Sequence, residues 1–329
     1  MTRFDYRMEK HPETGWQLVR LMSFGADDAH ALSELAFTPE IGSNLISFAV
    51  GGTEYLCDHR PTEHGHAILG TPILYPTPDR MRKATFTFDG RVFTFEPNAG
   101  AEFIHGLVRE VPWRFDMPVV TADEISVSTW VAFDPGKPYY ERFPIRNRLE
   151  LTYTLRANGM RFGFAVHNED PGQRLPFGLG IHPYFRIIGP RESVRIQVPA
   201  RKWQEVTRTD LLPTGRLLDI EDGPADLRAP TSLGGLDMDD VFWGMCPAAP
   251  QVIYYDQIGA KITLKASELF THSAVYTPLG RPFFCVENQS CSTDAHNLYA
   301  QGGQEAAHLV ILDPGQSLAA WVEFEVSDQ

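Results

Sequence analysis

A histidine among glycines is one residue of this chain that could do chemistry. It is His182 in the stretch FGLGIHPYF, residues 177–185, which otherwise has the pattern of a β-strand. Because side chains alternate between the two faces of a strand, Gly178, Gly180 and His182 share one face. Glycine inside a strand often marks a place where a ligand approaches the backbone. Two interpretations stay open: a core histidine bonded to a carbonyl, or an imidazole that a bound molecule can reach.

A carboxylate on an apolar strand is a second such residue. Glu287 lies in FFCVENQS, where Phe283 and Cys285 share its face. Burial of an unpaired charge is costly, so this carboxylate is either paired, for instance with Arg281, or has a raised pKa. A carboxyl with a pKa of about 6–7 is suited to general-base catalysis. The sequence therefore allows a structural ion pair and a catalytic base.

Three further polar residues stand beside turn or strand signals and aromatic residues. They are Arg80 in YPTPDRMRKATF, His105 in FIHGLVREVPW and Asp239 in LDMDDVFWG. The sequence contains no glycine-rich phosphate loop, no Gly-x-Ser-x-Gly motif and no Cys-His nucleophile signature. Acid–base chemistry by histidine and glutamate is therefore what the residue types favour.

A histidine-rich segment raises the question of a metal site. Residues 57–66, CDHRPTEHGH, offer Cys57, His59, His64 and His66, and a His-x-His pair can bind a metal ion. The segment has the composition of a loop, and no matching cluster of ligands follows it in the chain. We predict no metal and no cofactor.

Aromatic and basic side chains offer weaker signals. Trp113, Trp243 and Trp321 could stack on a sugar ring, although most tryptophans simply fill the core. Arg82 and Lys83 beside Arg80 form a small basic patch, which is more typical of a solvated face than of an anion site. Neither set decides the function by itself.

The elements that must position these residues have the pattern of antiparallel strands. Apolar residues alternate on both sides of Asp89-Gly90 in residues 85–95, Gly51-Gly52 in residues 44–56 and Asn158-Gly159 in residues 148–168. Residues 27–37 fit a short helix and a strand about equally well. No linker, repeat or low-complexity segment divides the chain. We expect an all-β protein in which residues 1–329 form a single domain, one large antiparallel β-sandwich.

Composition excludes several classes of partner. The 329 residues carry a net charge of −13, whereas binding to nucleic acid or an anionic membrane requires a basic surface. The N-terminal residues are polar, unlike a signal peptide, and no apolar run reaches the length of a membrane span. The four cysteines, Cys57, Cys246, Cys285 and Cys291, form no CxxC pair. We expect a cytoplasmic protein with reduced thiols, as a monomer or homodimer.

Taken in order, these motifs resemble the aldose 1-epimerase (mutarotase) family over nearly the whole chain. The matching elements are NLISFAVGGTEYL, TPDRMRKATFTFDG, the His-Gly at 105–106, the His-Pro-Tyr-Phe at 182–185, the Pro-Thr-Gly at 213–215, the Asp-x-x-Phe at 239–242 and the late Val-Glu strand with Glu287. Each motif is short, but seven in the order of the family are hard to obtain by chance.

The resemblance implies a fold and a set of roles. The fold is a large antiparallel β-sandwich with an open cleft, without metal or cofactor, and the partner is a small-molecule sugar. Glu287 is implied as the general base on the anomeric hydroxyl and His182 as the general acid on the ring oxygen, with assistance from His105. Arg80 and Asp239 would hold sugar hydroxyls. On this interpretation, the glycines beside His182 leave a bare face across which a flat sugar reaches the imidazole.

Two departures from the family pattern bear on the substrate. Asp79 stands where the family usually has Asn, so the hydrogen bonding at that position stays open. The segment HGLVREVPW also resembles the hexose-6-phosphate epimerase branch, in which Arg109, together with the basic residues near Arg80, would receive a phosphate. The segment TPDRMRKATFTFDG and the acidic net charge favour an uncharged aldose instead.

Functions of another class remain as alternatives. A non-catalytic carbohydrate-binding domain could use the same fold, because fold does not fix function. A retaining glycosidase would need two carboxylates about 5–5.5 Å apart, whereas the motifs supply one carboxylate with histidines. Acid–base residues on both sides of the C1–O5 bond suit anomer exchange, since a histidine can give and retake a proton near neutral pH.

Overall fold

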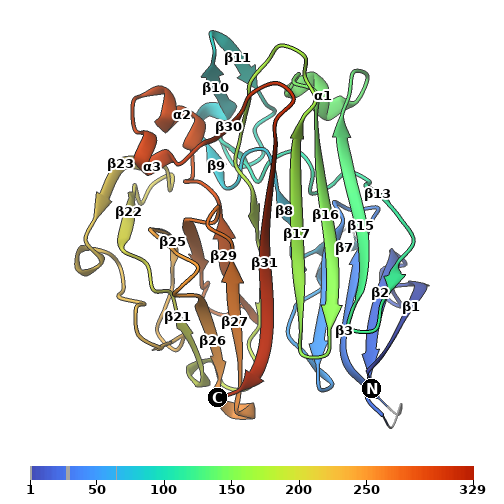
Figure 1. The fold of residues 1–329 in the computed structure, drawn as a ribbon. Coiled ribbons are helices and arrows are strands. Elements are labelled where there is room, and N and C mark those ends of the chain that lie inside the picture. Colours follow the sequence, from blue (N-terminus) through green and yellow to red (C-terminus); the bar gives the residue numbers. More distant parts are fainter. Residues whose placement is uncertain (1, 27–29, 64) are drawn as a thin grey trace.

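The computed structural model describes residues 2–26, 30–63 and 65–329 of the chain. Over these residues the chain folds mainly into antiparallel strands, with short helices between some of them (Figure 1). The strands form two large sheets, a smaller N-terminal sheet and several two-stranded ribbons. The prediction of an all-β protein with a large antiparallel β-sandwich is confirmed.

The larger sheet contains ten strands within the described residues. Its order is β13 (Arg114–Phe115), β15 (Ile125–Phe133), β16 (Asn147–Arg156), β17 (Gly159–Asn168), β31 (Ser317–Asp328), β27 (Ala260–Ala266), β26 (Gln251–Tyr255), β21 (Val194–Gln197) and β24 (Thr231–Ser232), with β14 (Val119–Val120) beside β15. Strand β15 alternates strictly between buried and partly exposed residues, and β16 and β17 do so over most of their length. This alternation is what half-buried strands require, because successive side chains point to opposite faces.

The second large sheet carries most of the candidate site and has eight strands in the described part of the chain. Its order is β23 (Pro213–Leu218), β22 (Lys202–Val206), β25 (Asp239–Trp243), β28 (His272–Tyr276), β29 (Phe283–Gln289), β19 (Gly180–Ile181) and β8 (Ile73–Leu74), with β20 (Tyr184–Arg186) paired to β29. Strand β29 is buried along its whole length. The sheet therefore holds Glu287 away from bulk solvent.

The remaining elements extend the two sheets. The N-terminal sheet runs β1 (Arg3–Lys10), β2 (Gln17–Phe24), β3 (Ala31–Thr38), β4 (Asn44–Val50) and β5 (Thr53–Glu54). The ribbons pair β6 (His59–Thr62) with β7 (Gly65–Ile68), β9 (Arg80–Met81) with β12 (Phe103–Ile104), β10 (Thr85–Phe88) with β11 (Arg91–Thr94), and β18 (Leu175–Phe177) with β30 (Val310–Leu312). The helices are α1 (Pro138–Arg142), α2 (Ala295–Ala300) and α3 (Gln304–Ala307), with 3₁₀ turns at Arg82–Ala84, Arg191–Ser193, Ile220–Asp222 and Asp256–Ile258. None of the described helices has the length and apolar character needed to cross a membrane.

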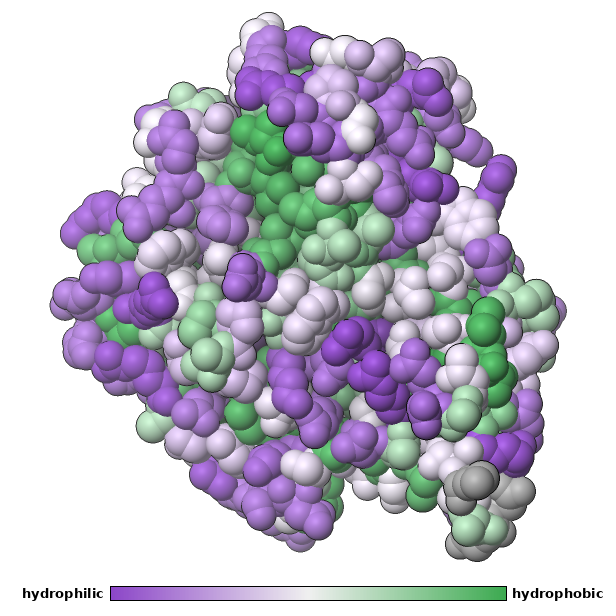
Figure 2. All heavy atoms as spheres, in the orientation of Figure 1, coloured by the Kyte–Doolittle hydropathy of each residue, from purple (hydrophilic) through white to green (hydrophobic). Residues whose placement is uncertain are grey.

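One apolar cluster joins the three sheets. The ring of Phe324 in β31 lies 5.5 Å from that of Phe185 in β20 and 6.0 Å from that of Phe48 in β4. All three side chains are fully buried. Burying a side chain of this size contributes about 1.5–3 kcal/mol relative to leaving it exposed, so such contacts fix the packing of the sheets. The outer face seen in Figure 2 is mainly polar, with apolar side chains gathered in a hollow of its upper half.

Two of the three predicted hairpin turns lie where the sequence places them. Asp89 and Gly90 join β10 to β11, and Gly51 and Gly52 join β4 to β5, all four with positive φ. The third turn is shifted by one residue, since Gly159 pairs with Arg156 and belongs to β17. A Cβ atom at Gly159 would lie 2.4 Å from the carbonyl oxygen of Phe324. This glycine therefore serves strand packing instead of turn conformation.

The ambiguous segment 27–37 resolves as a strand. Residues 31–38 form β3, so the helical alternative for this part is wrong, and Asp27, Asp28 and Ala29 lie outside the described residues. Residues 31–37 pair with β2 on one side, and β4 lies on the other side of β3. Pairing on both sides gives the backbone more hydrogen bonds than an isolated short helix, whose nucleation is costly.

Candidate active site

Neighbouring strands of the eight-stranded sheet bring several polar side chains together. Asp239 in β25 is directly opposite Tyr276 in β28, Tyr276 is opposite Cys285 in β29, and Cys285 is opposite Tyr184 in β20. Directly opposed residues share a face of the sheet. Glu287, two residues beyond Cys285, lies on the same face by alternation. The register of the sheet therefore places Glu287 beside the row that runs from Asp239 to Tyr184.

His182 and Glu287 are in direct contact. The Nε2 atom of His182 lies 3.3 Å from Oε1 of Glu287, and the two side chains are 7% and 4% exposed. Glu287 makes no ion pair with Arg281 in the described residues, so the alternative of a structural Glu–Arg pair is wrong. The backbone N–H of His182 donates to the carbonyl of Pro72, which fixes the histidine between β19 and β20.

His105 approaches the same pair from a turn with an unusual backbone. Its ring centroid lies 5.1 Å from that of His182, with the rings edge to face. His105 has a φ of +68° and Gly106 a φ of +71°, and the N–H of His105 donates to the carbonyl of Asp79. A non-glycine residue in the left-handed region costs free energy and occurs preferentially at functional sites. A Cβ atom at Gly106 would lie 2.2 Å from the carbonyl oxygen of Tyr75, so only glycine fits after this histidine.

Arg80 links two carboxylates at the edge of the site. Its guanidinium lies 3.4 Å from Oδ2 of Asp239 and 3.4 Å from Oδ1 of Asp79. Asp79 is 7% exposed and adopts a φ of +56°. Burial raises the pKa of Asp79 to about 6, against the opposing effect of the Arg80 charge. Asp79 therefore belongs to the site as a buried acid, which its spacing in the sequence does not reveal.

The environment favours the uncharged forms of the central pair. Burial raises the pKa of Glu287 well above its ordinary value, and the charges of Asp79 and Asp239 add to this effect. Burial, together with the nearby charge of Arg109, lowers the pKa of His182 to about 3. Burial also lowers the pKa of His105, and the neighbouring His182 and Arg109 act in the same direction. In these uncharged forms, the pair has one proton that can pass between Oε1 of Glu287 and Nε2 of His182.

The two histidines each keep one nitrogen without a partner. Among the described residues, the Nδ1 atoms of His105 and His182 are buried and have no hydrogen-bond partner. Buried polar atoms are nearly always satisfied, so exceptions call for an explanation such as a catalytic role or a bound molecule. The site therefore retains unused hydrogen-bonding capacity beside a shared proton.

Gln289 is a member of the site that the sequence interpretation missed. Its Nε2 atom donates to Oε2 of Glu287 over 3.0 Å, and its side chain is buried. This hydrogen bond lowers the pKa of Glu287, in opposition to burial. The signal was present in the strand pattern, because Gln289 follows Glu287 by two residues and shares its face.

The glycines before His182 serve packing and not sugar access. A Cβ atom at Gly178 would lie 2.2 Å from Sγ of Cys291. A Cβ atom at Gly180 would lie 3.1 Å from Cγ of Gln289, which is directly opposite in β29. The expectation that these glycines leave a bare face for a flat sugar is therefore wrong. The space they leave is filled by side chains of the protein itself.

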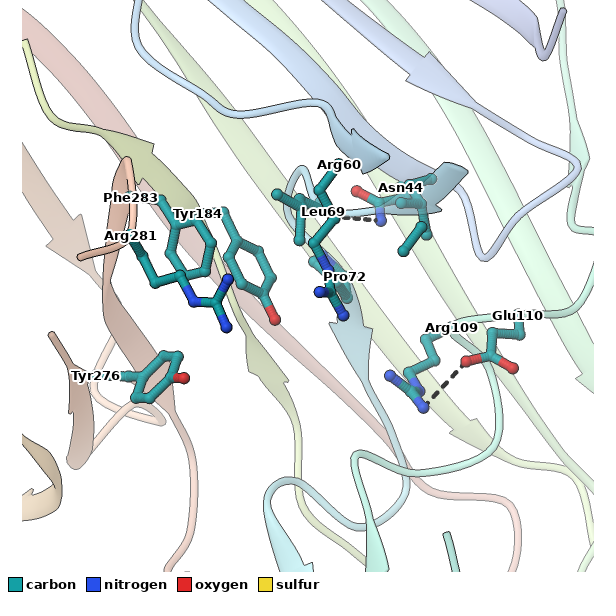
Figure 3. Close-up of a pocket in the computed structure, with 12 residues that line it drawn as sticks. Asn44, Arg60, Leu69, Pro72, Arg109, Glu110, Tyr184, Tyr276, Arg281 and Phe283 are labelled. Carbon is teal, nitrogen blue, oxygen red and sulfur yellow. Dashed lines mark hydrogen bonds and ion pairs between the residues drawn. The ribbon is translucent and has the colours of Figure 1, made fainter. Parts of the chain in front are cut away.

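Tyr184, the neighbour of His182 in the site, lines a cavity of about 500 Å³ (Figure 3). The cavity is lined by Asn44, Arg60, Ala67, Ile68, Leu69, Pro72, Arg109, Glu110, Tyr184, Tyr276, Arg281 and Phe283. The ring of Tyr184 connects it to the acid–base residues, because it stacks on His182 with centroids 4.5 Å apart and planes 13° apart. The lining thus includes neither His182 nor Glu287, but it includes a ring that is in contact with His182.

The remaining basic and aromatic candidates, apart from Arg109, lie away from the cavity. Arg82 pairs with the buried Asp294 over 3.3 Å, while Arg109 pairs with Glu110 over 3.0 Å at the wall of the cavity. The indole N–H of Trp113 donates to the carbonyl of Val108 in the core. Trp243 and Trp321 do not line the cavity either. None of these tryptophans is placed to stack on a sugar in it.

The histidine-rich segment forms a separate cluster. His11, Asp58 and His59 bring three potential ligand atoms within 4.8 Å of one another. The Nδ1 atom of His11 accepts hydrogen bonds from the backbone N–H groups of Glu13 and Thr14, so its Nε2 carries the proton and donates to Asp58 over 3.0 Å. A nitrogen that carries a proton has no lone pair for a metal ion. His66 packs its ring against that of His59, and His64 lies outside the described residues.

Comparison with known proteins gives a consistent picture. A model of the family described as aldose 1-epimerase matches residues 29–325. Galactose mutarotase of Sus scrofa is 28% identical over 161 residues, which make up 47% of this chain and 44% of that protein. The uncharacterized protein YphB of Escherichia coli strain K12 is 24% identical over 262 residues, or 77% of this chain and 82% of that protein. The match thus spans less than half the length of the curated mutarotase.

Solved structures share the fold. A galactose mutarotase-like protein from Clostridium acetobutylicum superposes with a TM-score of 0.82 at 16% identity, covering 99% of both chains. Galactose 1-epimerase from Lactobacillus acidophilus NCFM superposes with a TM-score of 0.75 at 17% identity, covering 100% of this chain and 99% of that one. At these identities, the structural likeness establishes the architecture alone.

Proposed function

The chain belongs to the aldose 1-epimerase family, and we propose that it interconverts the α- and β-anomers of a hexose by acid–base opening of the sugar ring. The observation that carries the proposal is the buried contact of 3.3 Å between His182 and Glu287 beside a cavity. Anomer exchange requires removal of a proton from O1 and delivery of a proton to the ring oxygen. One acid and one base that act on the same sugar are sufficient for both steps.

One proton held between His182 and Glu287 provides both the acid and the base that the reaction needs. When it resides on His182, Glu287 is a carboxylate that can accept the O1 proton, and the imidazolium can donate to the ring oxygen. The C1–O5 bond then breaks as the C1 carbonyl forms, the open-chain aldehyde rotates about C1–C2, and closure on the other face reverses both transfers. Each positioned acid or base contributes about 10²- to 10⁴-fold to the rate.

Other residues of the site have supporting roles in this proposal. The unpartnered nitrogen of His105 would assist at the ring oxygen, and Arg80 with Asp239 would hold sugar hydroxyls. Gln289 is a positioning residue, since its amide holds one oxygen of Glu287 and leaves the other facing His182. Fixed donors and acceptors of this kind lower the cost of orienting the substrate.

A non-catalytic sugar-binding domain is the alternative from another class. Sugar binding alone gains nothing from a carboxyl and an imidazole buried together with unsatisfied nitrogens, because such groups cost stability. An acid–base pair that can move one proton is useful only if protons are transferred. The arrangement therefore favours catalysis over binding alone.

The proposal is tested by the variant Glu287→Gln, which keeps the shape and hydrogen bonding but removes the base. Anomer exchange, followed by polarimetry or exchange NMR, should fall by about 10²-fold or more, while sugar binding measured by calorimetry persists. Cys285→Ser, a near-isosteric change on the same strand face, is the control and should keep the rate within a few-fold. Wild-type exchange in Glu287→Gln would show that the base assignment is wrong and would favour the binding domain.

A further inference from the structure

Two arginines in the wall of the cavity have no carboxylate partner. Arg60 in β6 and Arg281 before β29 make no hydrogen bond or ion pair within residues 2–26, 30–63 and 65–329, and both are exposed. Several other arginines near the surface are paired with carboxylates, such as Arg195 with Asp256 and Arg216 with Glu205. Unlike other exposed arginines without an ion pair among the described residues, such as Arg7 and Arg201, Arg60 and Arg281 line the same cavity.

The two arginines flank a pair of tyrosine hydroxyls. Figure 3 shows the guanidinium groups of Arg60 and Arg281 on opposite sides of the Tyr184 hydroxyl, with the hydroxyl of Tyr276 directed into the same space. They come from distant parts of the chain, the β6–β7 ribbon and the turn before β29. Guanidinium groups bind carboxylates and phosphates with two parallel hydrogen bonds, and neutral hydroxyl donors can complete such a site.

We propose that Arg60 and Arg281 bind an anionic substituent of the sugar, a carboxylate or a phosphate at the end remote from C1. This proposal rests on the proposed function, whose substrate class it specifies. Tyr184 connects the two regions, because its ring stacks on His182 while its hydroxyl faces the arginines. A sugar whose reacting carbon lies at His182 and Glu287 would therefore extend its other end into the cavity.

The proposal reverses the expectation of an uncharged aldose, which depended partly on the net charge of the chain. Net charge describes the average potential around the protein, whereas a cavity lined by one sign of charge concentrates its own field. Arg109 lies in the same wall, but its ion pair with Glu110 reduces its availability. The free positive charge of the cavity thus comes from Arg60 and Arg281.

The test compares anomer exchange of glucose, glucose 6-phosphate and glucuronate by the full-length protein. We expect a higher kcat/KM for at least one anionic sugar than for glucose, and the identity of that sugar distinguishes phosphate from carboxylate recognition. In the double variant Arg60→Gln/Arg281→Gln, the ratio of anionic to neutral kcat/KM should fall by about 10- to 100-fold, as expected for loss of charged hydrogen bonds. Arg216→Gln, which removes an exposed paired arginine, is the control and should leave this ratio unchanged.

The outcomes separate this proposal from the proposed function. Equal or better use of glucose, with a ratio unaffected by the double variant, would overturn the anion site and leave the epimerase proposal intact. If no sugar is exchanged, calorimetric titration with glucose 6-phosphate and glucuronate decides: binding that is lost in the double variant supports the anion site although the epimerase proposal has failed. Absence of both exchange and arginine-dependent binding overturns the two proposals together.

Discussion

The protein contains two clusters of histidine and carboxylate that look alike in composition and differ in their hydrogen bonding. One joins His182 to Glu287 over 3.3 Å, and the other joins His11 to Asp58 over 3.0 Å. Each has a second histidine nearby, His105 in the first and His59 in the second. Residue types and contact distances alone therefore do not distinguish a candidate catalytic centre from a structural one.

The direction of the carboxyl pKa shift separates the two clusters. In the second cluster, both ring nitrogens of His11 are partnered, and burial of Asp58 is outweighed by hydrogen bonds from His11 and His59, so that the pKa of Asp58 is lowered. In the first cluster, burial dominates and the pKa of Glu287 is raised, while His182 keeps an unpartnered nitrogen. One carboxylate is stabilised as an anion and the other as an acid. Glu287, whose pKa is raised, is therefore better suited to general acid–base chemistry than Asp58.

The largest expected effect tests this contrast by removing one histidine from each cluster. His182→Asn should reduce anomer exchange by about 10²-fold or more, because the pair then lacks its acid. His11→Asn should change the rate by less than a few-fold, since its partners serve the fold. Polarimetry on both variants measures the difference.

The double variant His182→Asn/Glu287→Gln sharpens this prediction. Residues that act on one proton transfer behave as a unit, so the double variant should be scarcely slower than either single variant. Additive losses in the double variant, or a loss in His11→Asn as large as that in His182→Asn, would contradict the assignment of the shared proton.

A smaller effect concerns the pH dependence of the first cluster. Asp79 has a pKa of about 6, so at higher pH its charge raises the pKa of Glu287. The active pair needs its single proton, and kcat/KM should therefore fall as pH rises through the pKa at which the pair loses it. In Asp79→Asn this alkaline limb should move to lower pH by about one unit, because a neighbouring negative charge has gone.

The pH profile of kcat/KM for both proteins measures this shift. Asp294→Asn, which removes another buried carboxylate that pairs with Arg82, is the control and should leave the limb in place. An unchanged or alkaline-shifted limb in Asp79→Asn would show that Asp79 is not coupled to the proton of the pair.

The fold was predictable from the sequence because its signal is local. Alternation in residues 148–168 and glycine-containing turns such as Asp89-Gly90 specify strands and hairpins without knowledge of the rest of the chain. The candidate residues His182 and Glu287 stand out in the sequence for a similar reason, since each interrupts an apolar stretch, and their roles stay a prediction.

The details of the site depend on pairing between distant strands and escaped prediction. Gly180 is needed because Gln289, more than one hundred residues later, lies directly opposite. Arg60 and Arg281 meet at one cavity only after β6 and β29 have been placed in the fold. A single sequence shows neither contact, because register and loop position are set by the tertiary structure.

The smallest expected effect falls on the second cluster and concerns stability. In Asp58→Asn the hydrogen bonds from His11 and His59 lose their charged acceptor, which should lower the free energy of unfolding by about 1–2 kcal/mol at pH 7. The pKa of Asp58 is lowered in the folded state, so the unfolded state binds more protons and stability rises with pH through this range. The contribution is therefore complete above pH 3.8 and is lost as pH falls through the lower folded-state pKa. Urea unfolding between pH 3 and 7 should show the stabilities of the wild-type protein and Asp58→Asn converging at the acid end.

The control is Glu13→Gln, at the exposed partner of His59, which should lower the free energy of unfolding by less than about 0.5 kcal/mol. A loss of anomer exchange in Asp58→Asn without a loss of stability would instead assign this cluster to the chemistry.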